Sequence, residues 1–165
     1  MLVFGMRVIF LDADGVLNNG SRRTVRVPMI GGGTAAAPVF HPECVGRFNR
    51  LVRESRAGVV VSATWGRPFE TTALRVYLRG QGVECVVLGQ TPVQSAWRPR
   101  GHDIAEWMES SGGSVESFCI LDDHDDMVHL HRYLVRVEYA VGIRERHVHE
   151  ALVLLAGGDG EPGDG

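Results

Sequence analysis

Short apolar runs alternate along this chain with longer segments whose apolar residues recur at helical spacing. The apolar runs predict strands over residues 8–11, 58–61, 84–88, 118–121 and 133–137. The periodic segments predict helices over residues 43–55, 69–78, 102–110 and 145–155. Strands that are apolar throughout are typical of a parallel sheet with both faces covered. The sequence therefore favours an α/β fold in three αβα layers around a central parallel sheet.

The chain length and the composition of its loops indicate how the domain is organised. A length of 165 residues suits one domain, which we expect over residues 1–156, and the polar, glycine-rich residues 157–165 predict a disordered tail. The long connection over residues 18–40 alternates polar and apolar residues at 24–27 and then has three glycines, which predicts a mobile hairpin or flap. Such a connection is either a solvated insertion or a functional lid.

The charge balance excludes some classes of partner. A formal net charge of -3 gives no bulk attraction to nucleic acid or to an anionic membrane. All 17 strong cations are arginines, so any fixed cation in a site must be a guanidinium. The scattered cysteines, Cys44, Cys85 and Cys119, favour reduced thiols. With no stretch long enough to span a membrane, we expect a cytoplasmic protein, and no obligate protein partner is evident.

Polar residues follow three of the predicted strands. Asp12 comes directly after the first strand, Ser62 after the second and Asp122 after the fourth. The carboxyl ends of parallel strands meet at one edge of the sheet, where ligands bind in folds of this class. The sequence therefore predicts a binding site that these three side chains share.

Two carboxylates, Asp12 and Asp14, lie one residue apart after the first strand. In an extended segment they point the same way and repel each other, unless a cation such as Mg²⁺ lies between them. The alternative is that Asp14 and Gly15 form a simple turn. Four more acids, two of them Asp122 and Asp123, crowd into residues 122–126, and helix capping by Asp123 or Asp125 accounts for only one of them.

Hydroxyl, amide and guanidinium groups that suit a phosphoryl group occur at the same predicted edge. Ser62 and the backbone N–H groups after it, including that of Ala63, can contact phosphoryl oxygens, and Arg67 is close in sequence. Arg98 and Arg100 precede the third predicted helix and offer a balancing cation. Together with the aspartates, these groups predict phosphoryl transfer through an aspartyl intermediate.

Several motifs in the sequence resemble the haloacid dehalogenase (HAD) superfamily of phosphohydrolases. The stretch FLDADGVLN is similar to its first motif, Ser62 in VVVSATW to its second, and ILDDHDDM to its acidic fourth. With RGHDIAEWM, these stretches resemble more narrowly the small HAD domains of Swiss-army-knife RNA-repair proteins. The third motif is usually a lysine, so Arg100, or else Arg98, stands in its place, and Gly66 separates Arg67 from its expected tryptophan neighbour.

This resemblance implies a Rossmann-like HAD fold with only a minimal cap or flap. It implies that Asp12 is the nucleophile and Asp14 the general acid and base. It further implies that Mg²⁺ is held by Asp12, the Asp14 carbonyl, Asp122 and Asp123. The residues that hold the phosphoryl oxygens are then expected to be Ser62, Ala63, Arg67 and Arg100.

The histidines and tryptophans allow other interpretations. His124, His129 and His131 lie near the acids, but their spacing matches no standard zinc site. His147 and His149 are expected at the surface. Trp65, Trp97 and Trp107 are expected in core or rim packing, with stacking on a nucleic-acid base as the alternative.

Two classes of function remain open from the sequence. The first is a Mg²⁺-dependent phosphatase acting on an oligonucleotide end or on a small phosphomonoester such as a nucleotide. The second is a catalytically degenerate HAD fold that serves as a binding or regulatory module. A phospho-receiver is excluded, because receivers pair their acids at the first strand and accept the phosphoryl group on an aspartate after a later one.

Overall fold

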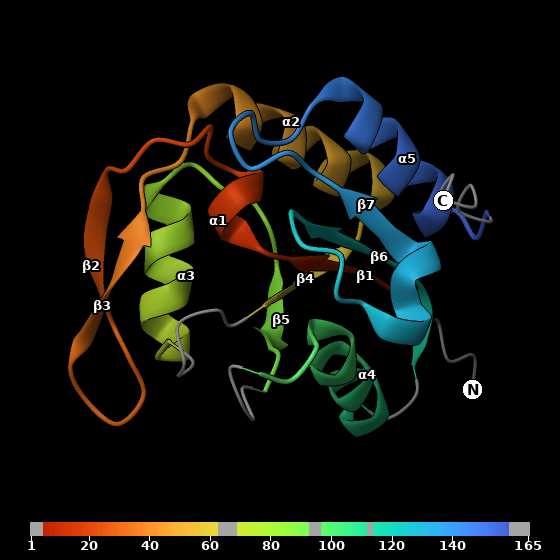
Figure 1. The fold of residues 1–165 in the computed structure, drawn as a ribbon, viewed down its shortest axis with the longest axis horizontal. Coiled ribbons are helices and arrows are strands. Elements are labelled where there is room, and N and C mark those ends of the chain that lie inside the picture. The colour runs from red at the N-terminus through yellow and green to blue at the C-terminus, as the bar shows by residue number, and fades with distance from the viewer. Residues whose placement is uncertain (1–4, 63–68, 93–96, 112–113, 159–165) are drawn as a thin grey trace.

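The computed structural model describes residues 5–62, 69–92, 97–111 and 114–158. Their centre is a five-stranded sheet in the order β5-β4-β1-β6-β7, and every neighbouring pair in it is parallel (Figure 1). The strands are β1 (Met6–Leu11), β4 (Gly58–Val61), β5 (Val87–Gln90), β6 (Val115–Asp122) and β7 (Leu134–Arg136). The predicted parallel sheet and Rossmann-like αβα architecture are thereby confirmed.

Helices cover both faces of this sheet (Figure 1). Alternate residues of β1 belong to two separate cores: Ile9 and Leu11 pack in one, and Val8 and Phe10 in the other. The first core takes residues of α2 (Pro42–Ser55), α3 (Thr71–Gly80) and α5 (Glu145–Leu155), and the second takes residues of α4 (Arg100–Ser110) and the 3₁₀ helix η1 (Val128–Tyr133). Burial on both faces explains why the strands are apolar throughout.

Two predicted elements begin later than the sequence pattern suggested. The edge strand expected at 84–88 starts at Val87, because its partner β4 is only four residues long and pairs Val59 with Val87. The helix expected from residue 69 starts at Thr71, because the Glu70 side chain accepts hydrogen bonds from the backbone N–H groups of Thr72 and Ala73.

The connection over residues 18–40 forms an antiparallel hairpin of β2 (Thr24–Pro28) and β3 (Thr34–Pro38). The predicted hairpin is confirmed, and it is anchored on α3 rather than free of the domain. The Tyr77 hydroxyl donates a hydrogen bond to the Pro38 carbonyl, and the Glu70 N–H donates to the Pro28 carbonyl. The hairpin therefore has a fixed position beside α3 (Figure 1).

The turn that follows α5 extends into the region expected to be disordered. The N–H groups of Gly157 and Gly158 donate to the carbonyls of Leu154 and Val153, while the rest of the expected tail lies outside the described residues. The single domain over 1–156 stays a prediction. None of the described helices has the length and apolar character needed to cross a bilayer.

Candidate active site

The register of the sheet brings Asp12, Ser62 and Asp122 side by side at its carboxyl edge. The Asp12 N–H donates to the Leu121 carbonyl of β6 at 2.9 Å, and the Ser62 N–H donates to the Leu11 carbonyl of β1 at 2.8 Å. All three residues are buried. Three neighbouring strands, β4, β1 and β6, thus each place one polar residue at the same level.

The turn after β1 packs directly against the acidic loop that follows β6. It forms α1 (Ala13–Val16), a short irregular helix in which Gly15 adopts a φ of 98°. A Cβ atom at position 15 would lie 2.9 Å from Oδ1 of Asp123. Glycine is required here both by the left-handed backbone and by the close approach of the Asp123 carboxylate.

Asn18 fixes the carboxylate of Asp14, a role that the sequence analysis missed. Its Oδ1 accepts a hydrogen bond from the Gly15 N–H at 2.7 Å, and its Nδ2 donates to Oδ1 of Asp14 at 2.9 Å. Because the Gly15 contact fixes which end of the amide is the acceptor, Nδ2 must face Asp14. The one feature of the sequence that could have indicated this role is the polar side chain of Asn18, at a position that is buried in the structure.

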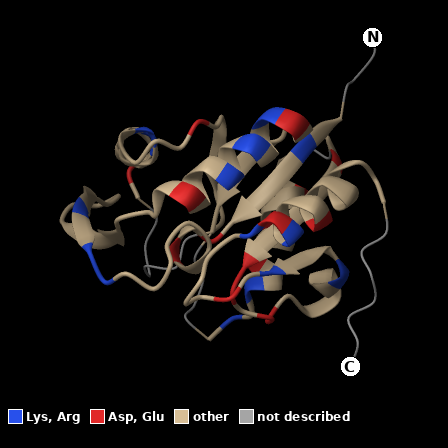
Figure 2. Cartoon of the chain, turned by 90° about the horizontal axis from the view of Figure 1, so that it is seen from above, with Lys and Arg blue, Asp and Glu red and all other residues tan. Residues whose placement is uncertain are grey.

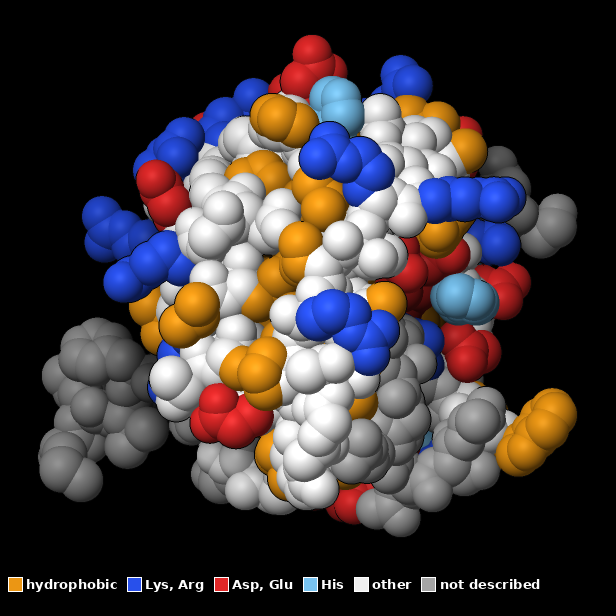
Figure 3. All heavy atoms as spheres, turned by 90° about the vertical axis from the view of Figure 1, so that its left-hand side faces the viewer, with side chains coloured by type: hydrophobic (Ala, Val, Ile, Leu, Met, Phe, Trp, Pro, Cys, Tyr) orange, Lys and Arg blue, Asp and Glu red, His pale blue; other side chains and the backbone are white. Residues whose placement is uncertain are grey.

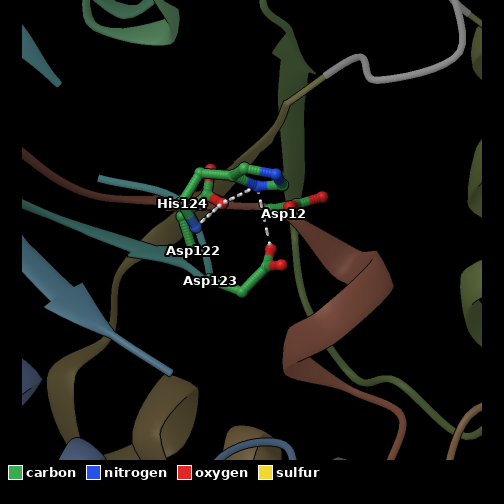
Figure 4. A group of neighbouring side chains, drawn as sticks. All are labelled: Asp12, Asp122, Asp123 and His124. Carbon is green, nitrogen blue, oxygen red and sulfur yellow. Dashed lines mark hydrogen bonds and ion pairs between the residues drawn. The ribbon is translucent and has the colours of Figure 1, made fainter. Parts of the chain in front are cut away.

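An acidic group with one histidine forms at the edge of the sheet (Figure 4). Asp12, Asp122, Asp123 and His124 each offer one ligand atom, and these atoms lie within 4.8 Å of one another. The Asp122 carboxylate accepts a hydrogen bond from the His124 backbone N–H at 3.0 Å. The carboxylate of Asp14 is not part of this group, so only its main-chain carbonyl remains as the metal ligand that the resemblance implied.

Arg100 is the arginine that reaches the buried carboxylates. Its Nη1 lies 3.5 Å from Oδ2 of Asp12 and 3.2 Å from Oδ2 of Asp122. Arg98 instead pairs within its own segment, with Asp103 at 3.4 Å and Glu106 at 2.8 Å. Of the two arginines considered from sequence, only Arg100 lies between the carboxylates of Asp12 and Asp122.

Close packing of α4 against the acidic loop positions Arg100. The Arg100 N–H donates to Oδ2 of Asp126 at 3.2 Å, and the Gly101 N–H donates to the Asp126 carbonyl at 3.1 Å. A Cβ atom at position 101 would lie 2.1 Å from the Met127 carbonyl oxygen. Asp126, and neither Asp123 nor Asp125, therefore caps a helix, and that helix is α4.

The buried carboxylates are costly when ionised. Burial, followed by the negative charge of Asp122, raises the pKa of Asp12 well above its ordinary value, and Arg100 only partly opposes this. Burial also raises the pKa of Asp122, against the lowering effects of Arg100 and the His124 N–H. A cation that joins this group removes the penalty, which is the electrostatic condition for a metal site.

The donor atoms fit a divalent cation at the edge and a phosphoryl group beside it. Oδ1 of Asp12 is buried and receives no hydrogen bond within the described part of the chain. Oxygen donors of this kind suit Mg²⁺ and related hard cations. The hydroxyl oxygen of Ser62 is likewise buried without a hydrogen-bond partner among the described residues, and is available to a ligand. Ala63 and Arg67, the other predicted phosphate-binding residues, lie outside the described residues.

The remaining aromatic and histidine expectations have mixed outcomes. Trp107 packs edge-on against Phe10 with ring centroids 5.6 Å apart, as expected, whereas Trp97 is 95% exposed and is therefore not a core residue. Trp65 lies outside the described residues.

His147 is buried rather than on the surface, with Nδ1 accepting a hydrogen bond from the Arg144 N–H. The helical spacing of His147, Ala151 and Leu154 in the sequence already indicated that His147 lies on the apolar side of α5.

Comparison with known proteins agrees with this geometry. A search of curated proteins found no significant match. The model of a family described as the HAD domain in Swiss Army Knife RNA repair proteins matches residues 8–148. This span runs from β1 through the acidic loop into α5 and includes every residue of the site. Membership suggests phosphohydrolase activity, and the acidic group is compatible with a bound divalent metal. The chain therefore belongs to the HAD family found in Swiss Army Knife RNA repair proteins.

Proposed function

We propose that this protein is a Mg²⁺-dependent phosphomonoester hydrolase that works through an aspartyl-phosphate intermediate. The observation that carries the proposal is the arrangement of Asp12 between Ser62 and Asp122, with the Arg100 guanidinium 3.5 Å from the Asp12 carboxylate. This is a nucleophile with a hydroxyl donor on one side, a metal carboxylate on the other and a cation beside it.

The proposed reaction has two steps. An oxygen of Asp12 attacks phosphorus in line and forms a P–O bond, while the bond to the ester oxygen breaks and that oxygen takes a proton from Asp14. Water then attacks the phosphoryl group and gives a proton to Asp14, and the bond to Asp12 breaks to release inorganic phosphate. Asn18 donates to Oδ1 of Asp14, so the other oxygen, Oδ2, is the one that carries the transferred proton.

The phosphoryl oxygens are held by hydrogen bonds and charge. The Ser62 hydroxyl and the Arg100 guanidinium are the donors within the described residues, and Ala63 and Arg67 complete the predicted set. Arg100 has two roles, because its positive charge also balances the carboxylates of Asp12 and Asp122 before substrate binds. Its planar fork can contact two phosphoryl oxygens, which a lysine ammonium cannot do in the same way.

A divalent cation would be held by Asp12, Asp122 and Asp123 with the main-chain carbonyl of Asp14. When bound, it supplies positive charge that offsets the repulsion between the Asp12 carboxylate and an anionic substrate. Binding there would also relieve the cost of burying Asp12 and Asp122 as anions.

The hairpin favours the phosphorylated end of a nucleic-acid strand as substrate. Residues 18–40 contain Arg22, Arg23 and Arg26 and no acidic residue, while charges elsewhere are interspersed along the elements (Figure 2). On the face seen from the hairpin side, arginine side chains lie around a patch of acidic ones (Figure 3). A strand end can enter a site without a large cap, and its neighbouring phosphates can contact local arginines despite the net charge of -3. A small phosphomonoester such as a nucleotide is the competing substrate class.

A phosphatase panel tests the proposed function. Purified protein is assayed with Mg²⁺ against 3′- and 5′-phosphorylated oligonucleotides, mononucleotides and an aryl phosphate. Asp12→Asn is expected to abolish phosphate release while the fold persists. Asp125→Asn, which removes an exposed acid of the same loop, is the matched control and should keep activity. No turnover by the unaltered protein would favour the degenerate binding module, and full activity of Asp12→Asn would refute the mechanism.

A further inference from the structure

His124 lies over the acidic group, although no part of the proposed catalytic machinery requires it (Figure 4). Its Nδ1 is 3.2 Å from Oδ1 of Asp123 and 3.4 Å from Oδ1 of Asp122. The side chain is 62% exposed, so no apolar packing holds the ring in this place. The hydrogen bond from the His124 N–H to Asp122 holds the backbone that carries the ring.

These separations match those between neighbouring ligands of one metal ion. Two ligands at right angles around a six-coordinate cation lie about 3 Å apart, because each is about 2.1–2.2 Å from the metal. Oδ1 of Asp12, buried and without a hydrogen-bond donor among the described residues, belongs to the same group. Three carboxylates and one imidazole therefore each place a ligand atom within 4.8 Å of the others, and the imidazole is the exposed member of the group.

The nitrogen donor changes which metal such a centre prefers. Oxygen-only sites suit Mg²⁺, whereas imidazole is a ligand for first-row transition metals. We propose that His124 is a metal ligand, and that the centre binds Mn²⁺ and Co²⁺ in preference to Mg²⁺. This inference rests on the metal centre of the proposed function and changes the identity of its preferred ion. A simple ion pair between His124 and Asp123 is the competing explanation.

Metal binding to the metal-free protein tests this assignment without any activity assay. Mn²⁺ and Mg²⁺ affinities are measured by calorimetry for the unaltered protein, for His124→Gln and for His129→Gln. His129 is exposed and outside the group, so His129→Gln is the matched control. We expect His124→Gln to weaken Mn²⁺ binding about tenfold or more and to leave Mg²⁺ binding within about threefold, with the control unchanged.

Spin-echo spectroscopy of bound Mn²⁺ gives a second, direct readout. Coupling to an imidazole ¹⁴N nucleus is expected in the unaltered protein and in His129→Gln, and is expected to vanish in His124→Gln. Absence of this coupling in the unaltered protein, or an unchanged ratio of the two affinities in His124→Gln, would overturn the inference and leave the proposed phosphatase intact. If neither ion binds the unaltered protein, both this inference and the metal centre of the proposed function are refuted.

Discussion

Asp12 is a buried carboxyl whose neighbours make ionisation unfavourable. Its raised pKa comes first from burial and then from the charge of Asp122, and the positive charge of Arg100 opposes both effects. The proposed role of Asp12 as nucleophile nevertheless requires its ionised form. In that proposal, the buried carboxylate lowers the stability of the metal-free protein and supplies a reactive group, which is common in catalytic sites.

Replacing Asp12 by asparagine should stabilise the metal-free protein at neutral pH. The folded state binds a proton at Asp12 more tightly than the unfolded state does, so ionisation costs stability as pH rises above the ordinary carboxyl pKa. We expect Asp12→Asn to raise the free energy of unfolding by about 1–2 kcal/mol at pH 7.5 and by less at pH 4.5. Urea unfolding in the presence of a chelator measures this, with Asp125→Asn as control. A lower stability of Asp12→Asn at pH 7.5 would contradict the argument.

In the proposed mechanism, Asn18 acts through Asp14 as a positioning residue. Without its amide, the Asp14 carboxylate loses the donor that fixes its orientation, so protonation of the leaving oxygen should suffer most. We expect Asn18→Ala to lower kcat about 10–100-fold for an alkyl phosphate and much less for an aryl phosphate, whose leaving group needs less help. Asn19→Ala, at the exposed neighbouring residue, is the control. Equal losses with both substrates would indicate a structural role alone.

At the scale of elements, the active site depends on how α4 and the loop after β6 fit together. Because residue 101 is a glycine, the first turn of α4 can approach Met127 closely. This contact fixes the position of Arg100. Asp126 accepts a hydrogen bond in the same turn, so the acidic loop contributes both to the acidic group and to the position of Arg100. The proposed metal-binding and phosphate-binding roles are therefore coupled through one packing contact.

Gly101→Ala should separate α4 from this loop. The added Cβ atom meets backbone, which cannot rotate away, and we expect a loss of about 1–3 kcal/mol in the free energy of unfolding. Displacement of Arg100 should raise KM for phosphomonoesters. Gly46→Ala in α2 is the matched control, because nothing beyond its chain neighbours and the nearby backbone of α2 lies within 4 Å of its Cβ position. That control should gain about 0.5–1 kcal/mol, since alanine favours the helix. Unchanged stability and KM in Gly101→Ala would refute the packing argument.

The first turn of α5 makes stability sensitive to acid through His147. Burial, with help from Arg146 and Arg144, lowers the pKa of His147 to about 4. Between this value and the ordinary pKa near 6.5, the unfolded state binds the proton and the folded state does not, so stability falls as pH drops through that window. We expect the unaltered protein to lose about 2 kcal/mol more than His147→Asn between pH 7.5 and pH 5. Urea titrations at both pH values measure the difference, and His149→Asn, on an exposed position of α5, should behave like the unaltered protein.

At the scale of the whole molecule, the metal group joins chain segments that lie far apart in sequence. Asp12 directly follows β1, while Asp122 and Asp123 lie more than a hundred positions later at the end of β6. Only the folded sheet brings their oxygens within 4.8 Å, so a cation that binds them binds the folded state alone. Metal binding and folding are therefore linked.

Divalent cations should raise the thermal stability of the protein, and a chelator should reverse the effect. A cation present at a hundred times its Kd stabilises the folded state by about 2.7 kcal/mol. We expect the Tm to rise with Mn²⁺ concentration in the unaltered protein and in Asp125→Asn, and to rise far less in Asp123→Asn. Differential scanning fluorimetry measures this, and an equal rise in all three proteins would indicate that the cations bind elsewhere.

Much of the fold could be predicted because its signals are local. The apolar runs at β1, β4 and β6 and the periodicity of α2 and α5 depend on burial patterns that neighbouring residues already express. The predicted boundaries were wrong where a neighbouring element sets them. One example is β5, whose first residue depends on the length of its partner strand β4. The expectation that His147 lies at the surface is wrong, although its helical phase with Ala151 and Leu154 places it on the buried side of α5.

The alternation of strands and helices follows from the order of residues along the chain, and with it the edge at which Asp12, Ser62 and Asp122 meet. Parallel strands share a direction, so residues that follow them must gather at one edge. Tertiary structure alone decided that Arg100 rather than Arg98 reaches the carboxylates, that Asn18 holds Asp14, and that His124 joins the acidic group. Each of these depends on distances of about 3 Å between side chains, which packing between distant segments sets and which spacing along the chain does not contain.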